Sequence, residues 1–179
     1  MTFTEIVIIV VFVALAGLGV YWWMMPSDHE VVAKQFQPHI AGYVDLMGQV
    51  DESLGPGSFA RDKPLRLPMI AVDVDGRTVD PLHSQMPEAW RATDPAGVAT
   101  VLLVKCETDH VGDYGFEDAY AHECRLWAID TETREVVWAE WARRSPPRRV
   151  SFNIPFMDII ADRPEREMLE QLGAAVGTK

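Results

Sequence analysis

The sequence contains few cysteines and little positive charge. Cys106 and Cys124 are its only two cysteines, and no C-x₂-C pair is present, which argues against a structural zinc site. Lysine and arginine total 16 against 27 aspartate and glutamate residues, so the formal net charge is −11. Phosphate backbones repel a domain this acidic, and we therefore expect no nucleic-acid partner.

Recognisable catalytic motifs are also missing from the sequence. The acidic residues do not follow the EF-hand spacing, and no nucleophile and base occur at a spacing typical of an active site. The sequence therefore predicts no catalytic residue and no cofactor. With 179 residues, of which 48% are hydrophobic, the chain is nevertheless long enough to bury the core of one domain.

One long apolar run is present at residues 6–25, IVIIVVFVALAGLGVYWWMM. It carries no charge and has the length that a helix needs to cross about 30 Å of hydrocarbon. A cleaved signal peptide would begin with basic residues and end in small ones, whereas MTFTE has neither Lys nor Arg and WWMM is bulky. We expect residues 1–26 to be an uncleaved, single-pass anchor in a bacterial inner (cytoplasmic) membrane, with the lipid bilayer as the partner of residues 6–25.

The remaining chain has the patterns of a mixed helical and β domain. Apolar residues recur at three- and four-residue spacing between positions 31 and 47, which predicts a juxtamembrane helical segment over residues 27–55. Strand patterns at 69–74, 100–106, 119–130 and 135–143 are separated mostly by short turns, and a helix is expected at 162–176. The predicted fold class is α+β: an N-terminal transmembrane helix, then one antiparallel meander with flanking helices over residues 56–179.

The two cysteines fit opposite each other in a hairpin. With Cys106 facing Cys124, apolar residues also face apolar residues along both strands (Val104 and Leu126, Leu102 and Ala128, Leu103 and Trp127, Val101 and Ile129). Extended to the next strand, the same reasoning pairs Trp127 with Trp138. Directly opposed strand residues lie within the reach of a disulfide, so we predict a Cys106–Cys124 bond, the alternative being two buried free thiols.

A disulfide favours an oxidising compartment, and therefore a periplasmic or otherwise extracytoplasmic domain. Lys34, the one basic residue near the apolar run, favours the opposite orientation.

Polar and acidic side chains concentrate at residues 109–123, DHVGDYGFEDAYAHE. Carboxylates and imidazoles are metal ligands, and Asp109, Asp113 and His122 are the candidates for a metal site. The alternative is an ordinary solvated hairpin loop.

Four arginines lie close together in an otherwise acidic chain, at Arg143, Arg144, Arg148 and Arg149. Such a patch is able to hold anionic lipid headgroups or an acidic protein partner, and its alternative is a solvated loop.

Residues 98–147 resemble an uncharacterised group of bacterial secreted or membrane-anchored domains. The shared pattern here is Val111-Gly112, Tyr114, Ala119-Tyr120, Cys124, Asp130, Thr133, Val136-Val137 and Pro146-Pro147. Ser145 stands where the group has glycine before the two prolines. The resemblance implies an envelope location and an accessory role, and it transfers no functional residue.

These observations favour a membrane-tethered accessory or interaction domain of the cell envelope, without catalytic activity and with an envelope protein as its partner. The alternative is a metal- or ligand-dependent envelope enzyme or sensor that uses the 109–123 loop.

Overall fold

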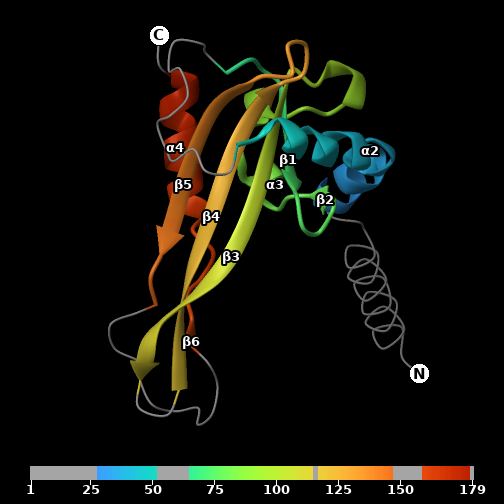
Figure 1. The fold of residues 1–179 in the computed structure, drawn as a ribbon. Helices are drawn as coiled ribbons and strands as arrows, with labels where there is room; N and C mark the ends of the chain where they lie inside the picture. Colours follow the sequence, from blue (N-terminus) through green and yellow to red (C-terminus); the bar gives the residue numbers. More distant parts are fainter. Residues whose placement is uncertain (1–27, 52–64, 115–116, 147–158, 178–179) are drawn as a thin grey trace, which may run out of the picture.

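A β-sheet with helices on both faces is the framework of the molecule (Figure 1). The computed structural model describes residues 28–51, 65–114, 117–146 and 159–177. The strands are β1 (Met69–Asp73), β2 (Thr78–Val79), β3 (Thr100–Tyr114), β4 (Glu117–Asp130), β5 (Val136–Arg144) and β6 (Ile159–Ile160). The helices are α2 (Asp28–Val44), α3 (Leu82–Gln85) and α4 (Glu165–Gly177), with short 3₁₀ turns η1 (Asp45–Gln49), η2 (Glu88–Trp90) and η3 (Pro95–Gly97).

The sheet is mixed, and the predicted antiparallel meander is therefore wrong. Its strands run in the order β2-β1-β3-β4-β5, with β6 beside β4. β1 and β3 are parallel, with Met69 opposite Thr100 and Asp73 opposite Val104. The physical reason is the connection over residues 80–99, which contains α3, η2 and η3 and returns the chain to the end of the sheet where β1 began.

The membrane part of the predicted fold class also needs correction. Residues 6–25 lie outside the described residues, and within the part of the chain that is described no helix is long and apolar enough to cross a bilayer. The helix nearest to the apolar run is α2, whose 17 residues, DHEVVAKQFQPHIAGYV, mix charged and apolar side chains. The described chain is an α+β unit.

α2 packs directly on the sheet rather than standing apart from it. Phe36 and Ile40 are completely or almost completely buried, in one cluster with Val72, Leu103 and Trp127. The apolar spacing that predicted a helix over residues 27–55 thus reflects a face that covers strands. The predicted domain boundary after residue 55 lies outside the described residues.

The opposite face of the sheet is covered by α3 and α4, as Figure 1 shows. Met168 and Leu172 of α4 are fully buried against Leu102 and Leu126. Full burial of one such side chain stabilises a fold by about 1.5–3 kcal/mol. Alternate residues of β3 and β4 therefore belong to two separate cores. Because both faces of these strands are buried, their sequences are nearly continuous apolar runs.

A largely buried ion pair joins the segments that lead into α3 and α4. The Arg163 guanidinium lies 2.5 Å from a carboxylate oxygen of Asp80, which is only 2% exposed. The other oxygen of Asp80 accepts the N–H of Leu82 at 2.8 Å, at the first turn of α3. Burial raises the pKa of Asp80, and Arg163 opposes that rise.

β3 and β4 extend well beyond their neighbours. β1 ends opposite Val104 and β5 ends opposite His122, whereas β3 and β4 stay paired as far as Tyr114 and Glu117. We call residues 107–114 and 117–123 the arm, which projects from the core in Figure 1. β6 pairs with β4 alongside it.

Candidate functional site

The predicted disulfide is present at the base of the arm. Cys106 of β3 lies directly opposite Cys124 of β4, and their sulfur atoms are 2.10 Å apart. The apolar pairings predicted from this register, such as Val104 with Leu126, are confirmed. The bond therefore joins the two strands at the point where they leave the core.

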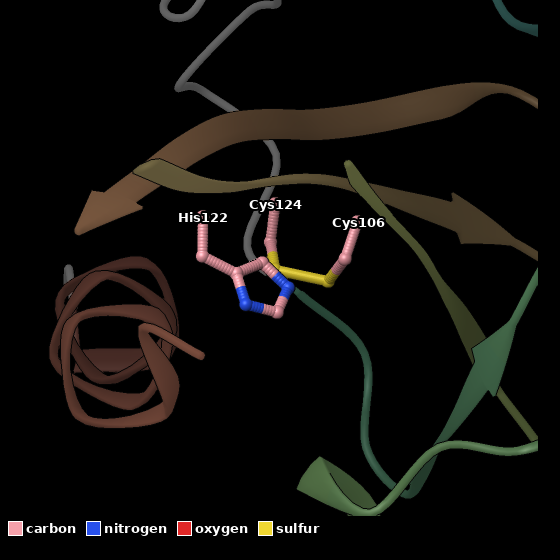
Figure 2. A group of neighbouring side chains, drawn as sticks. All are labelled: Cys106, His122 and Cys124. Carbon is pink, nitrogen blue, oxygen red and sulfur yellow. A yellow bond between two sulfur atoms is a disulfide. The ribbon is translucent and has the colours of Figure 1, made fainter. Parts of the chain in front are cut away.

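His122 lies beside this bond, as Figure 2 shows. It precedes Cys124 by two residues on β4, and side chains two apart on a strand share a face. The ligand atoms of Cys106, His122 and Cys124 all lie within 4.8 Å of one another. The structure thus brings two sulfurs and one imidazole together.

The sequence did not predict this group, because its two cysteines lack the C-x₂-C spacing of a typical zinc site. The signal was nevertheless there: the H-x-C spacing of His122 and Cys124 becomes a shared face once the hairpin register is fixed by Cys106.

The group sits at the rim of the core under α4. Cys124 is fully buried beside Ala142, in the cluster that contains Met168. Cys106 and His122 are half-buried. One side of the group is therefore dry and the other is open to solvent.

The three predicted metal ligands are not brought together. Asp109 points to the other face, where it lies 3.8 Å from Arg143. Asp113 contacts the imidazole of His110 at 3.1 Å, beyond a bulge between His110 and Gly112. His122 belongs to the cysteine group instead. Strand alternation and the bulge therefore separate the three side chains that the sequence had suggested as joint metal ligands.

A second group lies near the tip of the arm, made of His110, Asp113 and Asp118. All three side chains are at least half exposed, and His110 lies 3.6 Å from Asp118. Exposed ion pairs of this kind contribute little to stability, and they occur on many surfaces without a bound ion.

The predicted arginine patch is divided between two faces. Arg143 contacts Glu123 at 3.4 Å on one face of β5, while Arg144 lies opposite His122 on the other. Arg148 and Arg149 lie outside the described residues.

No protein-family model, curated protein or solved structure matches this chain. The resemblance of residues 98–147 to a group of envelope domains thus stays a prediction. What the geometry offers is a long acidic arm, a covalent bond at its base and an imidazole next to that bond.

Proposed function

We propose that this chain is a non-enzymatic interaction domain of the bacterial cell envelope, and that the arm is its contact element. The observation that carries the proposal is the outer edge of β3. From Cys106 onward no strand pairs with this edge within the residues described, although β3 is still paired with β4 on its other side.

The direction of the backbone groups along this edge follows from one hydrogen bond. The carbonyl of Val104 accepts the N–H of Val74 at 3.0 Å and therefore points away from β4. Backbone groups alternate in direction along a strand, so those of Cys106, Thr108 and His110 point the same way. An extended segment of another protein is able to pair with such an edge as an added strand.

The disulfide makes the arm a better binding element. A bond between Cys106 and Cys124 holds β3 and β4 in register where they leave the core. A hairpin that is ordered before binding loses less conformational entropy when a partner docks.

The charge of the arm indicates the chemistry of the partner. The sequence of the arm contains six acidic residues and neither lysine nor arginine: Glu107, Asp109, Asp113, Glu117, Asp118 and Glu123. Val111 adds an apolar side chain that is 44% exposed. The partner that fits is a protein with an extended segment containing lysine or arginine, since opposite charges steer and select such contacts.

The envelope location in this proposal rests on the cysteine pair. Disulfides persist in oxidising compartments such as the periplasm and are rare in the cytosol. A bonded pair at Cys106 and Cys124 therefore supports an extracytoplasmic position for the arm.

The test is site-specific photo-crosslinking in the source cell, with the reactive residue at position 111. In this background Thr108→Pro removes a backbone donor from the open edge, whereas the matched control Thr108→Ala keeps it. We expect one protein adduct in the parent and in Thr108→Ala, and its loss in Thr108→Pro. Equal adducts in both variants, or none in the parent, would contradict strand addition.

A charge reversal supplies an independent variant in case Thr108→Pro distorts the hairpin. Glu107→Lys leaves every backbone group in place, and we expect it to reduce the adduct. Its matched control is Glu170→Lys, which reverses a similarly exposed carboxylate on α4 rather than on the arm and should leave the yield unchanged. Equal yields in both lysine variants would refute the basic partner.

A further inference from the structure

The group at the base of the arm has the donor set of a soft metal ion. Thiolate sulfur and imidazole nitrogen are the ligands that zinc prefers in proteins. We infer that reduction of the Cys106–Cys124 bond creates a zinc site formed by both sulfurs and the His122 imidazole, with one coordination position left open. This inference goes beyond the docking function and does not depend on it.

The distances suit this metal without movement of the strands. The three ligand atoms lie within 4.8 Å of one another. In a tetrahedral site with Zn–S bonds of about 2.3 Å and Zn–N bonds of about 2.0–2.1 Å, these ligand atoms are roughly 3.5–3.8 Å apart. Rotation of the freed Cys106 and Cys124 side chains is enough to reach that spacing, because both already point to the face that carries His122 (Figure 2).

The chemistry balances with one reductant, which we take to be a protein dithiol. Its thiolate attacks one sulfur of the bond, and its second thiol completes the exchange. Two electrons and two protons pass to Cys106 and Cys124, and the reductant becomes a disulfide. Zinc then displaces both thiol protons as it binds the two thiolates and the neutral imidazole.

The surroundings favour an open, uncharged site. Two thiolates balance the charge of one Zn²⁺ ion, and the burial of Cys124 leaves little room for solvent on the side of the core. Cys106 and His122 are half-buried, so the fourth position faces solvent and is free for water or a partner's ligand. Arg144 is the charged residue opposite His122 on this face.

The site would therefore replace one cross-link with another. In the oxidised protein the bond joins β3 to β4, and in the reduced protein the metal joins the same two residues. The arm would remain fixed in both states, while the metal-bound state gains a reactive coordination position.

The test is a titration of the full chain with Co²⁺, a spectroscopic substitute for zinc, before and after reduction. Bound thiolates give a charge-transfer band in the near ultraviolet. We expect no band with oxidised protein and one equivalent of bound cobalt after reduction, displaced by added zinc. No band in the reduced protein would overturn the inference.

The role of His122 is tested with a variant that keeps both cysteines. Changing an outer-shell partner of a metal already costs about 10–100-fold in affinity, so loss of a ligand in His122→Ala should weaken zinc binding by at least about tenfold. His110→Ala removes the exposed histidine of the other group on the same arm and should leave the affinity unchanged. Equal zinc affinities of the two variants would show that His122 is not a ligand.

Discussion

Asp130 shows how a single side chain holds the turn between β4 and β5. Its carboxylate accepts the N–H groups of Glu132 at 3.0 Å and Thr133 at 2.9 Å, and it lies 3.1 Å from the Arg66 guanidinium. Burial alone would raise the pKa of Asp130. The hydrogen bonds and the positive charge outweigh it, so the pKa lies below its usual value.

Replacing Asp130 by asparagine should therefore destabilise the protein in a pH-dependent way. A depressed pKa in the folded state contributes stability that is present above the unfolded value of 3.8 and is lost as the pH falls through the folded value. At neutral pH we expect Asp130→Asn to lower the free energy of unfolding by about 1–3 kcal/mol, with the difference shrinking below pH 3.8. Denaturant unfolding at several pH values measures it.

Glu132 provides the control for this change. It lies 2.6 Å from the same guanidinium, but its side chain is 74% exposed. Exposed pairs contribute less than about 1 kcal/mol, so Glu132→Gln should have little effect. A pH-independent difference for Asp130→Asn would contradict the assigned charge interaction.

At the scale of residues, the sequence correctly predicted the bond between Cys106 and Cys124, but the side chains that it suggested as metal ligands lie apart. The cysteines are fixed by local alternation in two strong strands, which is visible in the sequence. The grouping of Asp109, Asp113 and His122 depended on how the arm twists and where it bulges. Gly112, with a φ of 146°, permits that bulge, and the spacing of the acidic residues does not predict it.

At the scale of elements, the hairpin of β3 and β4 was predictable and its junction with β5 was only partly so. Ile129 lies opposite Val136 as predicted, but a bulge after Ala128 shifts the rest by one residue. Trp127, almost fully buried, faces the small Ala139 instead of Trp138. Trp127 belongs to the core beneath α2, whereas Trp138 packs against the core on the opposite face, and this division appears only in the folded structure.

The disulfide should stabilise the arm more than the core. Closing the segment between Cys106 and Cys124, which are 18 residues apart, should contribute about 2–4 kcal/mol. The double variant Cys106→Ala/Cys124→Ala should lose that amount in denaturant unfolding. Amide hydrogens of residues 107–114 should exchange faster, because none of these residues belongs to either core cluster of the described chain.

The neighbouring cross-strand pair is the matched control. Thr108 lies directly opposite His122, and the two form the next cross-strand pair on the face that carries the disulfide. Replacing both with alanine should cost no more than about 1 kcal/mol, the upper range for one cross-strand pair. Equal losses in the two double variants would mean that the bond contributes nothing of its own.

At the scale of the molecule, the sequence indicated an α+β domain but not the path of its chain. Asp75-Gly76, a dipeptide typical of tight turns, lies between the antiparallel strands β1 and β2, so this connection is visible in the sequence. The parallel pairing of β1 with β3 depends on residues 80–99, where short helical turns lie between extended segments. The buried contact of Asp80 with Arg163, far apart in the sequence, is likewise a product of the assembled fold.

The oxidation state of Cys106 and Cys124 in the intact source cell is the most direct test of the proposal that the arm is a disulfide-bonded contact element in the envelope. Cells are treated with a membrane-permeant alkylating reagent, and the purified chain is then reduced and labelled with a second, heavier reagent before mass spectrometry. We predict that both cysteines carry only the second label, because they are bonded in the cell. Both cysteines carrying the first label would contradict a stapled arm in an oxidising compartment.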